Sequence, residues 1–315
     1  MKPDEAASTA SLLETFDATC EGIGVTSATF SINLYAAAAP SEIGQPIVDI
    51  FARYRELVGE DKLRFYATGT MSKHKPVTKR ALGMPAAWMK PGAALGDLVS
   101  VEYHDGANFN DAPKHLWAVH GTEQVDGERL TDPTLIRMSF PARSALDDPN
   151  AMIAWMTELW GMAQFRFGHA GFAFECSRYM AETAHEYAFS QSMRHPGIDI
   201  AHTVNDVIMM GEDAIRGIGW LTMLDDATAE KLGGREGLAK RLGDEAVVSV
   251  PRGVMLRAGE APQFGDVERW ADLSRYRAVY AAVQSLMTDT SEVPCLDIGG
   301  DFEARTEAWL TRFGA

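Results

Sequence analysis

Three residues in the first half of the chain have the chemistry of a proton-transfer site. His104 and Asp105 are adjacent at the end of one predicted strand, and His120 lies near the end of the next. A paired histidine and aspartate can move a proton in a hydrolase. Turn-forming aspartates and partly exposed histidines are also common at strand ends, so we favour a structural role for this group.

A second group in the other half has residue types that ligate metals. His195, Asp199 and His202 surround a Pro–Gly pair, and two imidazoles with a carboxylate could hold a metal ion or serve a hydrolase. The same residues fit a polar loop after a helix, with a histidine near the negative end of the helix dipole. Because the spacing is loose, the structural interpretation is again favoured.

Common catalytic signatures are absent from the sequence. It contains no Walker A loop, no GxGxxG, no HExxH and no GxSxG. Active sites can also form from scattered residues, but no group of residues here favours one. We therefore expect a protein that is not an enzyme, with no catalytic residue, no metal site and no cofactor.

A short basic run falls in a segment rich in Lys, Pro and Gly. It consists of Lys73, Lys75, Lys79 and Arg80, with His74 among them. Such a run can bind phosphate or an acidic protein. A solvated loop is the commoner explanation, and we predict a long loop over residues 71–97.

The overall charge restricts the kind of partner. The chain has 44 acidic and 29 basic residues and a net charge of −15. Nucleic acid and anionic lipid both attract basic proteins, so we expect no direct nucleic-acid or membrane contact. A basic protein partner would suit this charge, although acidity also serves solubility alone.

Cysteine usage and the first residues predict the compartment. Cys20, Cys176 and Cys295 are an odd number at wide spacing, without a CxxC pair, which fits a reducing compartment. The chain begins MKPDEAASTASLLETFD, without the apolar core of a secretion signal. No segment approaches the roughly 18 apolar residues of a membrane helix, so we expect a cytoplasmic protein.

Apolar periodicity predicts an α+β fold with a mainly antiparallel sheet and helices packed on its faces. Several strands follow one another without helices between them, which indicates antiparallel pairing. Predicted strands lie near residues 30–35, 63–67, 99–103, 117–119, 136–140, 172–174, 220–224, 247–250 and 254–256. Predicted helices lie near residues 46–58, 149–160, 178–193, 226–233, 238–242, 273–287 and 301–313, with Asp148, Asp226 and Asp301 as N-caps.

The most distinctive stretch is an ordered series of motifs between residues 217 and 277. It reads GIGWLTML from 217, LGGR from 232, PRGVMLRAG from 251, PQFGDV from 262 and LSRYR from 273. Most positions in these motifs have structural residue types, and we expect Gly253 and Gly265 to occupy turns with positive φ. The motif residues are Gly217, Trp220, Leu221, Gly233, Gly234, Gly253, Gly259, Gly265, Asp266 and Tyr276.

This series resembles the type VI immunity family, whose members are encoded beside VRR-nuclease effectors of the type VI secretion system. The resemblance implies an immunity protein, or antitoxin, that binds and neutralises a cognate effector toxin by direct contact. It implies that the toxin is a basic nuclease encoded by a neighbouring gene. It does not identify the residues that bind the toxin.

The resemblance also suggests a division of the chain. We expect an N-terminal extension over 1–24, an immunity-family domain over 25–290 and a C-terminal helix in 291–315. The middle part is either one unit or two similar lobes, 25–146 and 147–290. Two other functions remain as alternatives: a hydrolase, with or without a metal, that uses one of the His/Asp groups, and a scaffold or oligomerisation protein.

Overall fold

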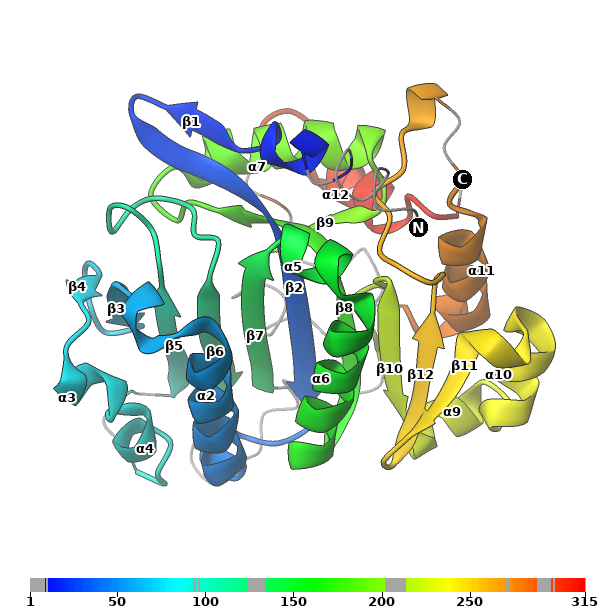
Figure 1. Ribbon diagram of the computed structural model, residues 1–315, viewed down its shortest axis with the longest axis horizontal. Helices are drawn as coiled ribbons and strands as arrows, with labels where there is room; N and C mark the ends of the chain where they lie inside the picture. Colours follow the sequence, from blue (N-terminus) through cyan, green and yellow to red (C-terminus); the bar gives the residue numbers. More distant parts are fainter. Residues whose placement is uncertain are drawn as a thin grey trace.

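The fold is organised around one large sheet. The computed structural model describes residues 9, 11–92, 95, 97–123, 134–201, 214–269, 272–287, 296 and 298–314. The strand order is β11-β12-β10-β8-β2-β7-β6-β5-β3-β4, with β1 paired to β2 and β9 paired to β8 (Figure 1). Within this sheet the β8–β9 pair is parallel, and the other pairs are antiparallel. The predicted α+β class is confirmed.

The strands vary greatly in length, and the two longest, β2 and β8, pair along most of their length at the centre of the sheet. The bounds are β1 Ala18–Cys20, β2 Ile23–Ala36, β3 Phe65–Thr68, β4 Lys75–Pro76, β5 Leu98–His104, β6 Leu116–Thr122, β7 Thr134–Pro141, β8 Phe165–Cys176, β9 Ile198–Ile200, β10 Leu221–Asp225, β11 Val247–Val250 and β12 Gly253–Arg257.

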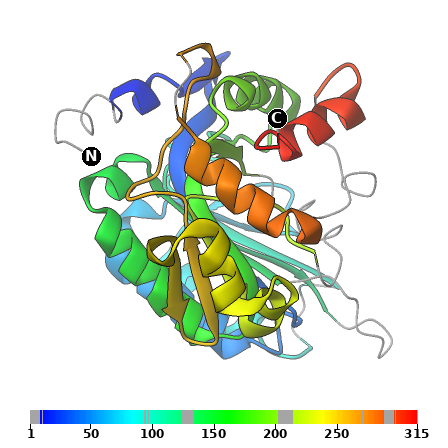
Figure 2. The ribbon, with the colours of Figure 1, turned by 90° about the vertical axis from the view of Figure 1, so that its right-hand side faces the viewer.

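Helices cover one face of the sheet, one end and one edge. Helices α2, α5 and α6 lie across the face toward the viewer in Figure 1, and the turned view of Figure 2 keeps α2 and α6 on the same side. Helices α7 and α12 lie at one end, and α9, α10 and α11 lie beside β10–β12. The helices are α2 Gly44–Val58, α3 Lys79–Leu82, α4 Pro85–Trp88, α5 Arg143–Asp147, α6 Pro149–Met162, α7 Ala181–Arg194, α9 Asp226–Lys231, α10 Gly234–Leu242, α11 Ser274–Val283 and α12 Phe302–Leu310, with 3-10 turns η1 Glu60–Lys62, η2 Asp244–Ala246, η3 Val267–Arg269 and η4 Gln284–Leu286.

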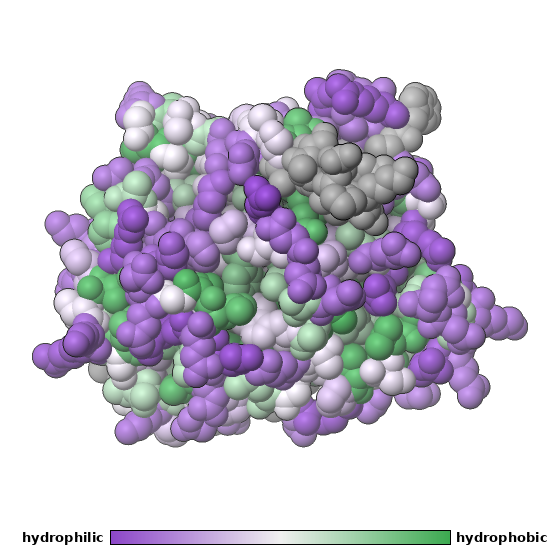
Figure 3. Space-filling view, viewed as in Figure 1, coloured by the Kyte–Doolittle hydropathy of each residue, from purple (hydrophilic) through white to green (hydrophobic). Residues whose placement is uncertain are grey.

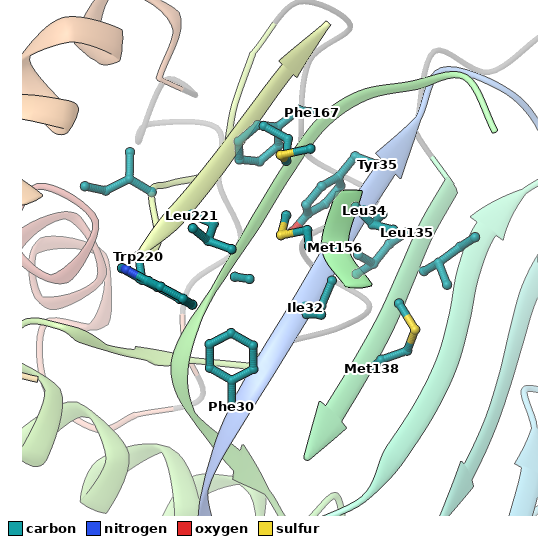
Figure 4. Packing of buried hydrophobic residues seen from close by; sticks show 14 of the residues in the cluster. Phe30, Ile32, Leu34, Tyr35, Leu135, Met138, Met156, Phe167, Trp220 and Leu221 are labelled. Carbon is teal, nitrogen blue, oxygen red and sulfur yellow. The ribbon is translucent and has the colours of Figure 1, made fainter. Parts of the chain in front are cut away.

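The helix-covered face of the sheet carries the apolar core. Phe30, Ile32 and Leu34 alternate along β2, and all three are fully buried. Met156 of α6 packs close to Leu34 (Figure 4). This contact is possible because β8 has a glycine at Gly168, where an added Cβ would lie 2.9 Å from Leu34 Cδ2. Met152, Leu159 and Trp160 of α6 are buried as well, so this face of the helix belongs to the core.

Several predicted helix starts are confirmed, and one is displaced by a residue. The Asp148 carboxylate accepts from the Ala151 N–H at 2.9 Å, with Pro149 as the first residue of α6. Asp301 caps α12 in the same way. The cap of α9 is Asp225, which accepts from the Thr228 N–H at 2.7 Å, and not Asp226. Either aspartate can cap a helix, and the end of β10 decides which one does.

The long loop predicted over 71–97 is more structured than expected. It contains β4 and the short helices α3 and α4. Thr78 starts α3 by accepting from the Ala81 N–H at 3.2 Å. These pieces have only two to four residues each, which is too short for apolar periodicity to reveal them.

The hairpin between β11 and β12 corrects the expectation for Gly253. Gly265 has the expected positive φ of 70°, but the positive φ in the hairpin belongs to Arg252, at 58°. Gly253 is needed for another reason: a Cβ there would lie 2.1 Å from the Leu224 carbonyl oxygen of β10. Glycine permits this close approach of two backbones.

Gly253→Ala should therefore lower the free energy of unfolding by about 2 kcal/mol or more, because the β10–β12 ladder must move to admit the methyl group. Gly217→Ala is the matched control, since an added Cβ there meets no atom of the described residues within 4 Å. Urea denaturation of both variants checks the prediction. Equal stability of the two variants would contradict it.

Candidate functional site

The sheet has a second buried face, and this one is polar. Glu102 of β5, Arg137 of β7 and His169 of β8 lie in one row across the sheet, with Ala118 and Asn33 between them. All five side chains point to the same side, because directly paired residues share a face. The three ionisable ones are at most 5% exposed. Buried charges need partners, and their partners define the site.

Glu102 is held by residues from two other parts of the chain. His74 Nε2 makes a short contact with Glu102 Oε1, and Arg178 donates to the same oxygen at 2.9 Å. The other ring nitrogen of His74 lies 3.1 Å from the Tyr179 hydroxyl. Burial alone would raise the pKa of Glu102, but the bond from His74 and the charge of Arg178 outweigh it and hold the pKa far below its usual value.

Arg137 and Glu175 form a second buried ion pair beside the first. Arg137 Nη2 lies 3.1 Å from Glu175 Oε2, and the two side chains are 6% and 2% exposed. The Ser139 hydroxyl donates to Oε1 of the same carboxylate. Burial raises the pKa of Glu175. Among the described residues, Nε and Nη1 of Arg137 have no hydrogen-bond partner.

These ion pairs line a pocket of about 210 Å³ between β5–β8 and the start of α7. Its charged and polar wall includes Glu102, His104, Arg137, Glu175 and Arg178. Two aromatic side chains also line it, Phe109 and Tyr179, which are 38% and 42% exposed. Their rings meet edge to face at a centroid distance of 5.3 Å. Charged groups and accessible aromatic rings in one hollow are typical of binding sites.

A separate charged cluster attaches the C-terminal helix to the sheet. Asp199 of β9 contacts Arg216 at 2.6 Å, Arg312 at 3.3 Å and His169 at 3.5 Å. Burial acts to raise the pKa of Asp199, but the charge of Arg216 and the His169 bond lower it overall. Burial lowers the pKa of Arg312 to about 10. The cluster is closely packed, and its contacts fix the structure around β9.

The structure does not assemble the first predicted acid–base group. Asp105 accepts from the backbone of Lys114 and His115, and pairs with the His115 ring at 2.7 Å. His104 is buried, and its Nδ1 accepts from the Gly106 N–H at 3.1 Å. Burial lowers the pKa of His104 to about 4. The partner of Asp105 is thus His115, and the expectation of a partly exposed His104 was wrong.

The second predicted group is also not brought together. His195 Nδ1 is bonded to the Gly265 carbonyl at 2.6 Å, while Asp199 belongs to the arginine cluster. His202 lies outside the described residues. Across the part of the chain that the structure describes, no three His, Cys, Asp or Glu residues are placed to hold a metal ion.

The basic run separates into two environments. Lys73, Lys75, Lys79 and Arg80 are exposed, as expected of a solvated segment. His74 is buried against Glu102.

The sequence did not reveal the central residues of the site, which are Glu102, Arg137 and Glu175. Glu102 and Arg137 are each the only Asp, Glu, Lys or Arg in their strands, whereas β8 carries Arg166 as well as Glu175. A lone charge in a mainly apolar strand was thus an available signal for the first two.

The motif residues of the second half make contacts within the chain. Trp220 Nε1 donates to the Gly259 carbonyl at 3.0 Å, and the Tyr276 hydroxyl accepts from the Gln263 N–H at 3.1 Å. Asp266 is 3.3 Å from Arg194. In strand β10, Leu221 is fully buried. None of these residues lines the pocket as described.

His120 makes the stability of the fold depend on pH. It is 1% exposed, and neither ring nitrogen has a partner among the described residues. Burial lowers its pKa from 6.5 to about 3, so the unfolded chain binds a proton that the folded chain does not. Stability from this histidine is complete above pH 6.5 and is lost as the pH falls toward 3.

His120→Leu should remove this loss. The gain in unfolding free energy over the wild type should be about 2 kcal/mol larger at pH 5 than at pH 7, because each pKa unit is worth about 1.4 kcal/mol. Urea denaturation at the two pH values measures the difference. If the variant gains the same unfolding free energy over the wild type at pH 5 and at pH 7, His120 protonates freely in the folded protein.

Comparison with known proteins identifies the class of this fold. A family described as "TsiV: Type VI immunity for VRR-NUC" matches residues 46–313. The chain therefore belongs to the type VI immunity family for VRR-nuclease effectors. No curated protein matches the chain.

A solved structure shares the fold. It is described as "Pseudomonas aeruginosa T6SS protein PA0821" and superposes with a TM-score of 0.81 at 18% sequence identity. The match covers 98% of this chain and 90% of that chain. No described helix is both long and apolar enough to span a membrane.

Proposed function

We propose that this protein is a cytoplasmic immunity protein that binds a VRR-nuclease effector of the type VI secretion system and neutralises it by direct contact. The family match over residues 46–313 is the observation that carries the proposal. The structural neighbour is itself described as a T6SS protein, which supports the same setting. The partner would be a toxin encoded by a neighbouring gene.

The charge of the chain supports a protein partner of opposite sign. Its net charge is −15, and a nuclease that binds phosphate presents basic groups that carboxylates can engage. A stable interface needs about 800 Å² from each partner, and the exposed area of this chain is 13752 Å². An inhibitory interface therefore requires only a small part of the surface. The same charge disfavours direct binding of nucleic acid.

The alternative functions have weaker support. The hydrolase hypothesis relied on two His/Asp groups, and the aspartates of both pair with other residues. A scaffold would favour a large apolar face, whereas hydrophilic residues cover most of the face in Figure 3 and the apolar ones lie in small groups. An immunity family also suggests a non-enzymatic role.

A rescue experiment tests the proposed function. We expect the product of one neighbouring gene to stop growth when expressed alone. Co-expression of this protein should restore growth, and the two should co-purify. An unrelated nuclease toxin is the control, and its toxicity should be unaffected. If neither neighbour is toxic or co-purifies, the proposal is wrong.

Charge steering adds a kinetic prediction for the purified pair. Raising ionic strength from about 0.01 to 0.15 M shortens the screening length from about 30 to 8 Å. The association rate constant should then fall about tenfold or more, while the dissociation rate constant changes much less. Stopped-flow fluorescence measures both. An association rate independent of salt would show that the acidity of this chain does not guide binding.

A further inference from the structure

Two exposed aromatic rings line the pocket beside Glu102. Phe109 and Tyr179 are 38% and 42% exposed, and their rings meet edge to face at a centroid distance of 5.3 Å. Most large apolar side chains of the described residues are buried, because apolar surface is destabilising in water. Aromatic side chains that stay exposed together at a hollow are typical of the anchor points of protein interfaces. A bound partner would therefore cover these two rings.

Glu102 offers this pocket an ionised oxygen that lacks a hydrogen-bond donor. The residue is 3% exposed, and its Oε1 accepts from both His74 and Arg178. Among the described residues no donor reaches Oε2, and this atom retains accessible surface. Although burial acts to raise the pKa of Glu102, the His74 bond and the Arg178 charge hold that pKa far below its usual value, so the carboxylate is charged. A buried anionic oxygen is stabilised most by a donor that carries positive charge.

The charges around the pocket favour a cation over an anion. Its lining contains three carboxylates, those of Glu102, Asp111 and Glu175, against the guanidinium groups of Arg137 and Arg178. The unpartnered nitrogens of Arg137 are enclosed by protein, so they cannot bond to an incoming anion. The charge of Arg178 is offset by Glu102 at 2.9 Å. The whole chain adds a net charge of −15, which attracts basic groups over a longer range.

We propose that the pocket receives an arginine side chain of the effector, whose guanidinium donates to Oε2 of Glu102 and packs against Phe109 and Tyr179. This contact rests on the proposed immunity function and specifies one point at which the effector is held. Arginine suits the pocket better than lysine, because its planar guanidinium carries five donors and stacks on aromatic rings. A hollow of about 210 Å³ has room for one long side chain, and a nuclease that binds phosphate presents arginines on its surface.

Variants of the pocket test this contact against the toxin that the rescue experiment identifies. Phe109→Ala removes one exposed ring, and Ala181→Leu narrows the pocket from the start of α7 without removing a charge. Each should weaken binding of the purified toxin about tenfold or more in isothermal titration calorimetry, because anchor contacts dominate interface energies. Phe302→Ala is the matched control, since Phe302 is an aromatic side chain of similar exposure, 45%, outside the pocket lining. This control should bind the toxin as the wild type does.

The outcomes distinguish this contact from the immunity function itself. Folding of each variant is checked by circular dichroism and the melting temperature. If the wild type binds the toxin and the folded pocket variants bind it with unchanged affinity, the pocket proposal is wrong and the immunity function stands. If the wild type binds no toxin encoded by a neighbouring gene, both proposals are overturned.

A small probe tests the preference for a cation on this chain alone. N-acetyl-L-arginine amide carries the guanidinium group, and N-acetyl-L-citrulline amide has the same shape with a neutral urea group. In ligand-observed NMR titrations the arginine probe should bind saturably at about millimolar concentration, because one side chain makes few contacts. The citrulline probe should bind about tenfold more weakly, and Ala181→Leu should weaken binding of the arginine probe. Equal affinity of the two probes, or no binding of the arginine probe, overturns the proposal.

Discussion

A central sheet that buries charged side chains on one face is the constraint on which the rest of this structure depends. Glu102, Arg137 and Glu175 are buried and the Asp199 side chain is 14% exposed, and losing one partner of a buried pair typically costs about 3–5 kcal/mol. Arg137 and Glu175 pair with each other inside the sheet, whereas counter-charges of Glu102 and Asp199 come from segments beside β4, before α7 and after α12. Peripheral segments are thereby tied to the sheet by charge as well as by apolar contact.

The motif series of residues 217–277 and the polar pocket lie in different parts of the molecule. The motif residues maintain β10, the β11–β12 hairpin and the approach to α11, through bonds such as Trp220 to Gly259. The pocket lies among β5–β8 and is lined by none of them. Residues that preserve a fold need not be those that meet a partner. The motif residues accordingly maintain the architecture, while the chemistry of the pocket depends on its own side chains.

The sequence predicted one side of the sheet well and the other poorly. Apolar alternation in residues 30–35 revealed β2 and its core face, because period two is a direct property of strands. The polar residues of the same alternation are buried too, since Ser31 and Asn33 are 1% and 6% exposed. Glu102 and Arg137 reach the pocket only through register across several strands. That information is not local, and composition and periodicity do not contain it.

The pairing of β2 has a consequence for synthesis of the chain. Ile32 has Met138 on one side and Ala170 on the other, so a strand made early receives both neighbours more than a hundred residues later. Such distant pairing carries a large loop-closure entropy and slows folding. On the ribosome, β2 must remain without its final partners until β8 has emerged. A newly started chain therefore completes the central sheet late, and until then the apolar residues and unpaired edges of β2 are open to aggregation.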